Sequence, residues 1–325
     1  MPIPDSCYYL ETVAGDGGNH TAAVFWLSPD IILNGGTDQA NQTGPNTVDV
    51  NVHSQPCENI ANDDDFTVDV YVGDPSLVMT PNNTTKLTNA VGRPAVAIAP
   101  PSLGSTLVSF NWINGGTADE TPGHKCLTAV LSDFMPSPNS FGIPTEPHSA
   151  QRNITILANK PPHSVDVNTI NENRTARETV TVRAIADTEP AEHVLQAARN
   201  VLKGVRDFKR FSTTNLPRFR MEFEGFPDAR VLNNTGRPSA KGTYGSLRVP
   251  NCETRFEMEP GQRTKFKFQV DLEEANYGDA FIFHLMHVDA KERVRGGLTV
   301  VGVGTRKQNF LWRWIIELIR SLTRR

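Results

Sequence analysis

Three consecutive carboxylates, Asp63, Asp64 and Asp65, lie in a polar stretch between two apolar segments of the chain. Carboxylate oxygens are the ligands that calcium takes in proteins, and Glu58 or Asp74 could add to such a set. The three aspartates are contiguous rather than alternating, and no glycine supplies the sharp turn of a dedicated calcium loop. The pattern therefore leaves a weak calcium site open and favours a solvated acidic loop.

Two histidines, His284 and His287, would form a metal pair only on a helix. They lie in the segment FIFHLMHV, which has the composition of a strand. On a strand, residues three apart point to opposite faces and cannot share one ion. No G-x-S-x-G, P-loop or G-x-G-x-x-G motif occurs, and neither His20 nor His124 lies in a nucleophile motif. The sequence thus predicts a non-enzymatic protein with no cofactor.

The C-terminal segment, residues 305–325, reads as a basic amphipathic helix. Arg313, Glu317, Arg320 and Arg324 recur at helical spacing and form one polar stripe, with apolar side chains on the remaining surface. The 13 residues from 310 to 322 would span only about 20 Å as a helix, less than the roughly 30 Å core of a bilayer. Such a helix would lie in a membrane interface or dock in a groove. The predicted contact residues are Leu311, Trp312, Arg313, Trp314, Ile315, Leu318, Ile319, Arg320, Leu322 and Arg324.

Three partners remain open for this helix: its own domain or a neighbouring subunit, a different protein, or an anionic membrane surface. The formal net charge of the chain is −4, which gives no reason to expect nucleic acid as a partner. Residues 306–325 alone carry +5, so the rest of the chain carries −9. The tail is therefore a different kind of segment from the sequence before it.

The N-terminal sequence MPIPDSCYYLETVAG has neither a basic n-region nor an apolar h-region, so a Sec-type signal is not expected. No run of 18 consecutive apolar residues occurs either. We expect a cytoplasmic protein or one exported without an N-terminal signal.

The elements that must carry these residues are strands. Between residues 46 and 72 two runs alternate strictly between apolar and polar side chains: Val48, Val50 and Val52, then Phe66, Val68, Val70 and Val72. Further strands are predicted within 22–33 and at 95–98, 105–112, 124–131 and 152–157. Six or seven strands in about 135 residues are typical of an immunoglobulin-like sandwich.

The order of these strands resembles a known family. The series NTVDVNVHSQ, FTVDVYVGDPS, STLVSFNW, GHKCLTAVLSD and SAQRNITIL is similar to the CARDB-type, adhesion-related sandwich domains of bacteria and archaea, over residues 22–158. One departure is the ending HSQPCEN of the first strand, where the family has a simple turn. The resemblance implies a spacer or interaction module, and the family has no catalytic residues to transfer.

The same topology brings the end of one strand, at Cys57, near the start of another, at Cys126. The resemblance thus raises a disulfide between them. If Leu127, Ala129 and Leu131 point inward, Cys126 points outward and the pair could not meet without a bulge. The alternative is that all four cysteines of the chain are free thiols.

The second half of the chain predicts another sandwich with an inserted helix. Strands are expected at 178–186, 219–223, 245–249, 252–258, 264–270, 280–288 and 298–303. A helix is expected at 189–205, capped by Thr188, with Val194, Leu195, Ala198, Val201, Leu202 and Val205 on its apolar face. The predicted domain map is an N-terminal arm at 1–21, a sandwich at 22–158, a linker at 159–176, a second sandwich at 177–304 and the helix at 305–325.

The predicted fold class is therefore all-β, with two immunoglobulin-like sandwiches, one inserted helix and a C-terminal amphipathic helix. The predicted function is that of a structural or recognition component that docks to a partner or subunit through the tail. Docking to a subunit would make the protein an oligomer. A peripheral or membrane-perturbing protein is the runner-up. An enzyme with a site built from loops is the third class.

Overall fold

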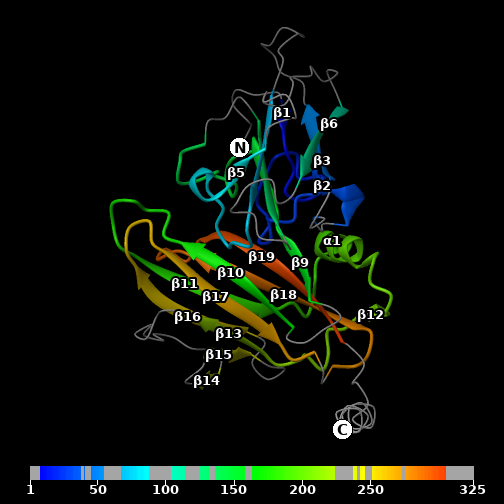
Figure 1. The fold of residues 1–325 in the computed structure, drawn as a ribbon, viewed down its shortest axis with the longest axis vertical. Coiled ribbons are helices and arrows are strands. Elements are labelled where there is room, and N and C mark those ends of the chain that lie inside the picture. Colours follow the sequence, from blue (N-terminus) through cyan, green and yellow to red (C-terminus); the bar gives the residue numbers. More distant parts are fainter. Residues whose placement is uncertain are drawn as a thin grey trace, which may run out of the picture.

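The computed structural model describes residues 8–37, 40, 45–54, 67–87, 104–113, 125–131, 136–157, 163–223, 237–239, 242–245, 251–272 and 275–304. In these residues the chain is mostly β-sheet and has one α-helix (Figure 1). Two short 3-10 helices lie in the connections between strands: η1 (Asn34–Gly36) and η2 (Pro81–Asn83). Within the same residues, no helix has both the length and the apolar character needed to cross a bilayer.

The first sandwich is built from two four-stranded antiparallel sheets, drawn in blue, cyan and green in Figure 1. One contains β1 (Tyr8–Tyr9), β2 (Ile31–Leu33), β3 (Pro45–Ser54) and β6 (Gly104–Ile113). The other contains β4 (Val68–Gly73), β5 (Thr85–Lys86), β7 (Cys126–Leu131) and β8 (Ser149–Arg152). β3 pairs along its whole length with β6, while β1 and β2 share its other edge.

The alternation that predicted the first sandwich is confirmed in its core. Each of the valines at 48, 50, 52, 68, 70 and 72 is at most 3% exposed, because one face of each strand packs against the opposite sheet. Leu127, Ala129 and Leu131 of β7 join the same core. Phe66 and the predicted strand at 95–98 lie outside the described residues.

The second sandwich also has two sheets. The first runs in the order β10 (Ser164–Ile170), β17 (Arg263–Val270), β13 (Phe219–Phe223), β15 (Gly242–Gly245) and β14 (Arg237–Ser239). The second runs in the order β16 (Asn251–Met258), β11 (Glu178–Ala186), β18 (Asp279–Val288), β19 (Val294–Val303) and β9 (Ile154–Leu157), with β12 (Arg210–Phe211) parallel to β18. Phe219, Phe268 and Phe283 pack between the sheets, with ring centroids 5.2–5.9 Å apart.

The strand predicted at 152–157 is wrong as a single element. The chain divides at Asn153: β8 pairs with β7 in the first sandwich, whereas β9 pairs in parallel with β19 in the second. Two more segments differ from expectation. Residues 164–170, inside the predicted linker, form β10, and Tyr8–Tyr9, inside the predicted arm, form β1. The division of the chain into domains at 22–158 and 177–304 stays a prediction.

The inserted helix, α1 (Glu192–Leu202), is shorter than the predicted 189–205. Its N-cap is Ala191, which is extended and makes no side-chain cap, so Thr188 is not the cap. Pro190 accounts for Glu189 lying outside the helix, because proline disfavours the helical region for the residue before it. The predicted apolar face is confirmed. Val194, Ala198, Val201 and Leu202 are buried, while Leu195 and Val205 are partly buried against the same cluster.

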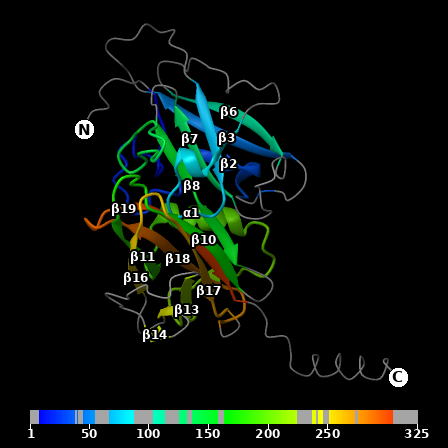
Figure 2. The same ribbon diagram turned by 60° about the vertical axis from the view of Figure 1, so that its left-hand side comes forward.

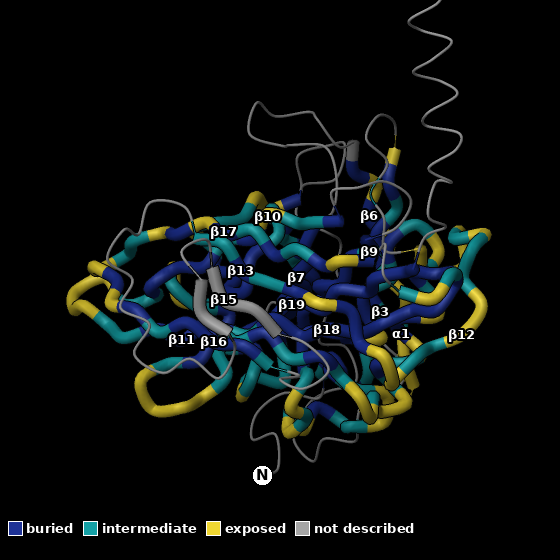
Figure 3. Tube along the Cα trace, turned by 90° about the horizontal axis from the view of Figure 1, so that it is seen from below, coloured by how far each residue is buried: buried dark blue, intermediate teal, exposed yellow. Residues whose placement is uncertain are grey.

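A third apolar core joins the two sandwiches. α1 packs there with Ala280 and Ile282 of β18 and with Val301 of β19, on the face of that sheet opposite the phenylalanine core. Phe25, Trp26, Cys126 and Val130 come to it from the first unit. Figures 1 and 2 show the two sandwiches stacked along the long axis with α1 beside their junction, and Figure 3 shows the buried strands running through the molecule.

Asn153 is the polar centre of this junction and is fully buried. Its side-chain amide donates to the carbonyls of Ser76 (2.9 Å) and Gly297 (2.6 Å), and its Oδ1 accepts from the thiol of Cys126. Its main chain bonds the first sandwich through the Trp26 carbonyl and the second through the Thr299 amide. This one residue therefore holds both units at the point where the chain leaves one for the other.

We expect Asn153→Ala to lower the free energy of unfolding by about 2–4 kcal/mol, because it leaves several buried polar groups without partners. Urea denaturation measures the loss. Asn82→Ala is the matched control, since that amide makes an exposed bond to Asn139 and its loss should cost under about 0.5 kcal/mol. Equal losses in the two variants would show that Asn153 does not hold the junction.

His287 lies between the two sheets of the second sandwich, where its Nδ1 is 2.8 Å from Oγ1 of Thr169 on β10. Burial, together with the nearby Arg295, lowers the pKa of this imidazole to about 4. The unfolded chain takes up this proton near the ordinary pKa of 6.5, so acid favours the unfolded state. The stability that the neutral ring provides is complete above pH 6.5 and is lost as the pH falls toward 4.

Between pH 7 and pH 4 we therefore expect His287 to account for about 3 kcal/mol of lost stability. His287→Gln keeps a side chain that can bond Thr169 but cannot titrate. Urea unfolding as a function of pH should show a shallower slope for this variant than for the parent chain across that range. Identical slopes would show that His287 is not a source of acid sensitivity.

Candidate functional site

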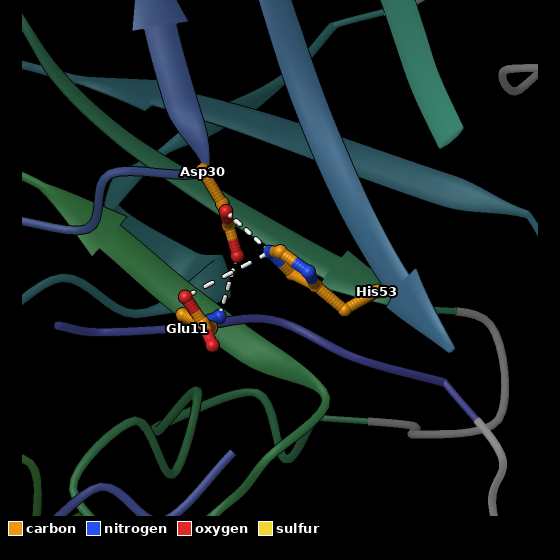
Figure 4. A group of neighbouring side chains, drawn as sticks. All are labelled: Glu11, Asp30 and His53. Atoms are coloured by element: carbon orange, nitrogen blue, oxygen red, sulfur yellow. Dashed lines mark hydrogen bonds and ion pairs between the residues drawn. The ribbon is translucent and has the colours of Figure 1, made fainter. Parts of the chain in front are cut away.

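A cluster of two carboxylates and one imidazole lies at one edge of the first sandwich (Figure 4). Glu11 follows β1, Asp30 precedes β2 and His53 is on β3. The Nε2 atom of His53 is 2.8 Å from Oδ1 of Asp30 and 3.9 Å from Oε2 of Glu11. Among the described residues, these three are the acidic, histidine or cysteine side chains that come together as a set of three with donor atoms close enough to share an ion.

Strand pairing brings the three residues together. β1 pairs with the end of β3, so Tyr9 lies opposite His53, and β2 pairs further along the same edge, so Ile31 lies opposite Val50. The Asp30 carbonyl also accepts from the amide of Asn51, which extends the β2 pairing by one residue. Positions far apart in sequence thus become neighbours because β1 and β2 share one edge of β3.

Backbone amides hold both carboxylates in place. Oδ2 of Asp30 accepts from the Glu11 amide at 2.6 Å, and the Glu11 carboxylate accepts from the amides of Gly15 (2.9 Å) and Gly17 (3.3 Å). Gly15 and Gly17 have φ of +80° and +58°, the left-handed region that favours glycine. The turn that orients Glu11 therefore depends on these two glycines.

The electrostatics of the cluster follow from its burial. Burial raises the pKa of Asp30, although the hydrogen bond from His53 and the Glu11 amide offset part of that rise. The hydrogen bond to Asp30 raises the pKa of His53 despite the opposing effect of burial. Tyr9 stacks on His53 with ring centroids 5.3 Å apart, and burial together with the carboxylates raises its pKa. The site can hold a proton on His53 or a cation between the three side chains.

A cavity of about 610 Å³ lies between this part of the first sandwich and α1. Its lining includes Pro29 and Ile31, which flank Asp30, and it extends to Arg152, His193 and Lys203. Its volume and mixed lining fall in the range of small-molecule sites.

A second polar series lies in the junction, buried at Thr299 and His284 and partly exposed at Asp187. Asp187 Oδ2 lies 2.9 Å from Nε2 of His284, and His284 Nδ1 lies 3.1 Å from Oγ1 of Thr299. Trp26 donates its indole N–H to the same hydroxyl at 3.0 Å. Burial raises the pKa of Asp187, but the hydrogen bond from His284, the charge of that ring and the Glu189 amide together outweigh burial, so the net pKa is lowered. His284 and the fully buried Thr299 are closed off from solvent, so this acid–histidine–hydroxyl series is a structural link.

The predicted positions of His284 and His287 are confirmed. His284 contacts Asp187 and Thr299 on one face of β18, whereas His287 contacts Thr169 on the other. The two rings therefore point to opposite faces of β18.

The other predicted site residues are placed only in part. Asp63, Asp64, Asp65, Cys57 and the whole tail from 305 to 325, with its ten predicted contact residues, lie outside the described residues, so the calcium site and the tail's contacts stay predictions. Cys126 is buried on the face of β7 opposite Leu127, as expected from the alternation, and burial raises the pKa of its thiol to about 12. Its bridge to Cys57 also stays a prediction.

Little in the sequence indicates the cluster of Glu11, Asp30 and His53. The three residues belong to no contiguous motif, and the segment with Glu11 reads as a polar arm. The available signal was the pair of glycines at 15 and 17 beside an acidic residue, which indicates a tight turn around a carboxylate.

No family model matches the chain, and no curated protein matches it either. Solved structures with distant similarity include bacterial adhesins. The collagen adhesin of S. aureus is 10% identical, with 85% of this chain and 92% of that chain covered and a TM-score of 0.23. The CupB6 tip adhesin of Pseudomonas aeruginosa is 10% identical, with 81% and 91% covered and a TM-score of 0.19. Scores this low do not establish a shared fold, so no property of these proteins is carried over.

We expect Asp30→Ala to lower the free energy of unfolding by about 2–3 kcal/mol, because it leaves the Glu11 amide and the His53 ring without their buried acceptor. Urea denaturation in the presence of EDTA measures this without any contribution from metal. Asp166→Ala is the matched control. It removes an exposed ion pair to Lys265 and should cost under about 1 kcal/mol. A loss as small for Asp30→Ala would show that the cluster does not stabilise the sandwich.

Proposed function

We propose that this protein is a non-enzymatic recognition scaffold in which two β-sandwich units form one rigid body that carries a docking helix at its C-terminal end. The third apolar core is the observation that carries the proposal. It combines side chains of both units with α1, and Asn153 bonds both units across it. A flexible linker would leave the units free to reorient, whereas a shared core fixes the direction in which each unit points.

The path of the last strand supports the position of the docking segment. β19 is buried between β18 and β9, and Val300, Val301 and Val303 are at most 1% exposed. Residue 304, which precedes the tail, is tied by hydrogen bonds to Gly278 and Asp279. A contact made by the tail would therefore act on β19, the strand whose Thr299 amide bonds Asn153 at the junction.

The polar series that runs from Trp26 through Thr299 and His284 to Asp187 supports a structural rather than a catalytic role for the junction. The Thr299 hydroxyl has the partners that a nucleophile would need, but the ring of Trp26 and the helix α1 lie over this region. A substrate cannot reach a fully buried hydroxyl without opening the core.

The tail is proposed to dock on a neighbouring subunit or another protein. Its sequence also supports a second candidate, an anionic membrane surface, because Trp312 and Trp314 flank an arginine within a strongly basic segment. The two candidates differ in the force on which they depend. Docking in a groove depends on the apolar face, whereas binding to anionic lipid depends on charge as well.

Truncation after Gly304 tests the docking role. We expect light scattering to give an oligomer for the full chain and a monomer for the truncated chain. Leu318→Asp should abolish association because it places a charge on the apolar face. A monomeric full chain that also fails to sediment with vesicles containing phosphatidylserine would contradict a docking role for the tail.

Arg320→Glu combined with Arg324→Glu distinguishes the two candidates. If the tail docks on protein, this variant keeps the oligomer, whereas vesicle co-sedimentation should be lost if the tail binds anionic lipid. Raised salt should weaken only the second interaction.

A further inference from the structure

We propose that Glu11, Asp30 and His53 bind one divalent transition-metal ion of the Zn²⁺ class, and that this ion fastens the N-terminal segment to the first sandwich. The proposal concerns the edge of β3 and is independent of the docking role of the tail.

The spacing of the three donor atoms fits such an ion. Nitrogen and carboxylate ligands lie about 2.0–2.2 Å from zinc, so two ligands in tetrahedral positions are separated by about 3.4 Å. The distances from His53 Nε2 to Asp30 Oδ1 and Glu11 Oε2, 2.8 Å and 3.9 Å, lie on either side of this value. All three donor atoms lie within 4.8 Å of one another, so small side-chain shifts would bring them to zinc distance.

The polar groups around His53 Nε2 accommodate a cation as readily as a proton at this point. A neutral Nε2 would direct its lone pair at the carboxylate oxygen of Asp30. A proton on Nε2 satisfies that oxygen, and the side-chain nitrogen of Asn51, 3.2 Å from Nε2, donates to the same oxygen at 3.4 Å. An ion would replace the proton and accept the lone pairs of all three ligands, while the Asn51 amide keeps its bond to Asp30.

The ligands are also held before any ion binds. The amide of Glu11 bonds Asp30, and the amides of Gly15 and Gly17 bond Glu11. Such contacts around metal ligands fix their orientation and raise affinity. Two carboxylates also place two negative charges beside a neutral imidazole, which a dication neutralises.

The ligand set selects the class of metal. Imidazole suits zinc and its transition-metal neighbours, and three protein ligands leave a fourth position for water. Calcium takes six to eight oxygen ligands, more than two carboxylate groups supply. The side chain of His53 is 20% exposed, so a water molecule can reach the open position.

Binding at this site would hold three elements together. Glu11 is next to β1, Asp30 is next to β2 and His53 is on β3, so one ion would connect both short edge strands to the strand that they flank. We therefore expect the metal to raise the melting temperature of the folded chain by several degrees, because binding to the native state stabilises it.

The test is a calorimetric titration of the full chain, without an affinity tag and treated with EDTA, with zinc chloride. We expect one equivalent of tight binding. Glu11→Gln keeps an oxygen that can accept from Gly15 and Gly17 but removes the charge, and His53→Gln removes the nitrogen ligand. Each should weaken zinc binding by at least about 100-fold, with circular dichroism confirming that the variant is folded.

His148→Ala is the matched control, because His148 also pairs with a carboxylate, that of Glu146, but outside this cluster. It should keep the parent affinity. Calcium chloride should give no binding in the same concentration range. Cobalt should give the visible absorption of a four-coordinate site in the parent chain and lose it in His53→Gln. The proposal is overturned if the parent chain binds no equivalent of zinc, if both ligand variants keep its affinity, or if calcium binds as tightly as zinc.

Discussion

The structure depends on the hydrogen bonds of Asn153, because the chain passes from one sandwich to the other at this residue. A strand that leaves one sheet and enters another must give its amide and carbonyl new partners within a buried space. Asn153 does so with its main chain, which bonds the Trp26 carbonyl and the Thr299 amide, and its side chain bonds two more carbonyls. The close packing around it is possible only because β19 has Gly297 at this point, where a Cβ would lie 2.6 Å from the Trp26 ring.

This junction determines how the rest of the molecule behaves. Since α1 and the outer faces of two sheets share one core, the two sandwiches are expected to unfold together rather than separately. The polar side chains that cross the core are paired in series, from Trp26 through Thr299 and His284 to Asp187. Such pairing meets the requirement that a buried polar group has a partner, and it also fixes the register of the surfaces that it joins.

The sequence predicted well those elements that are set by local alternation. Val48 to Val52 and Val68 to Val72 alternate because one face of each strand is buried, and that signal survives in any single sequence. It could not reveal that 152–157 serves two sheets, since Asn153 is one of several polar residues there, with Arg152 and Thr155, and nothing local marks it as the point where the chain changes sheets. It could not reveal the cluster either, because Glu11, Asp30 and His53 become neighbours only through strand pairing. The apolar period of the helix begins only at Val194, so it could not place the start of the helix, which lies at Glu192.

The position of the cluster follows from a weakness in the first sheet. β1 and β2 have two and three residues, so the ladder alone gives each of them few hydrogen bonds to β3. The Glu11 amide comes just after β1 and would lie buried without a strand partner, and the Asp30 carboxylate, just before β2, accepts from it. A side chain thus closes the gap between two short strands on one edge. The carboxylate must be buried to do this, and a buried carboxylate needs a positive partner. His53 supplies one when protonated, and a metal ion would supply a stronger one at the same place.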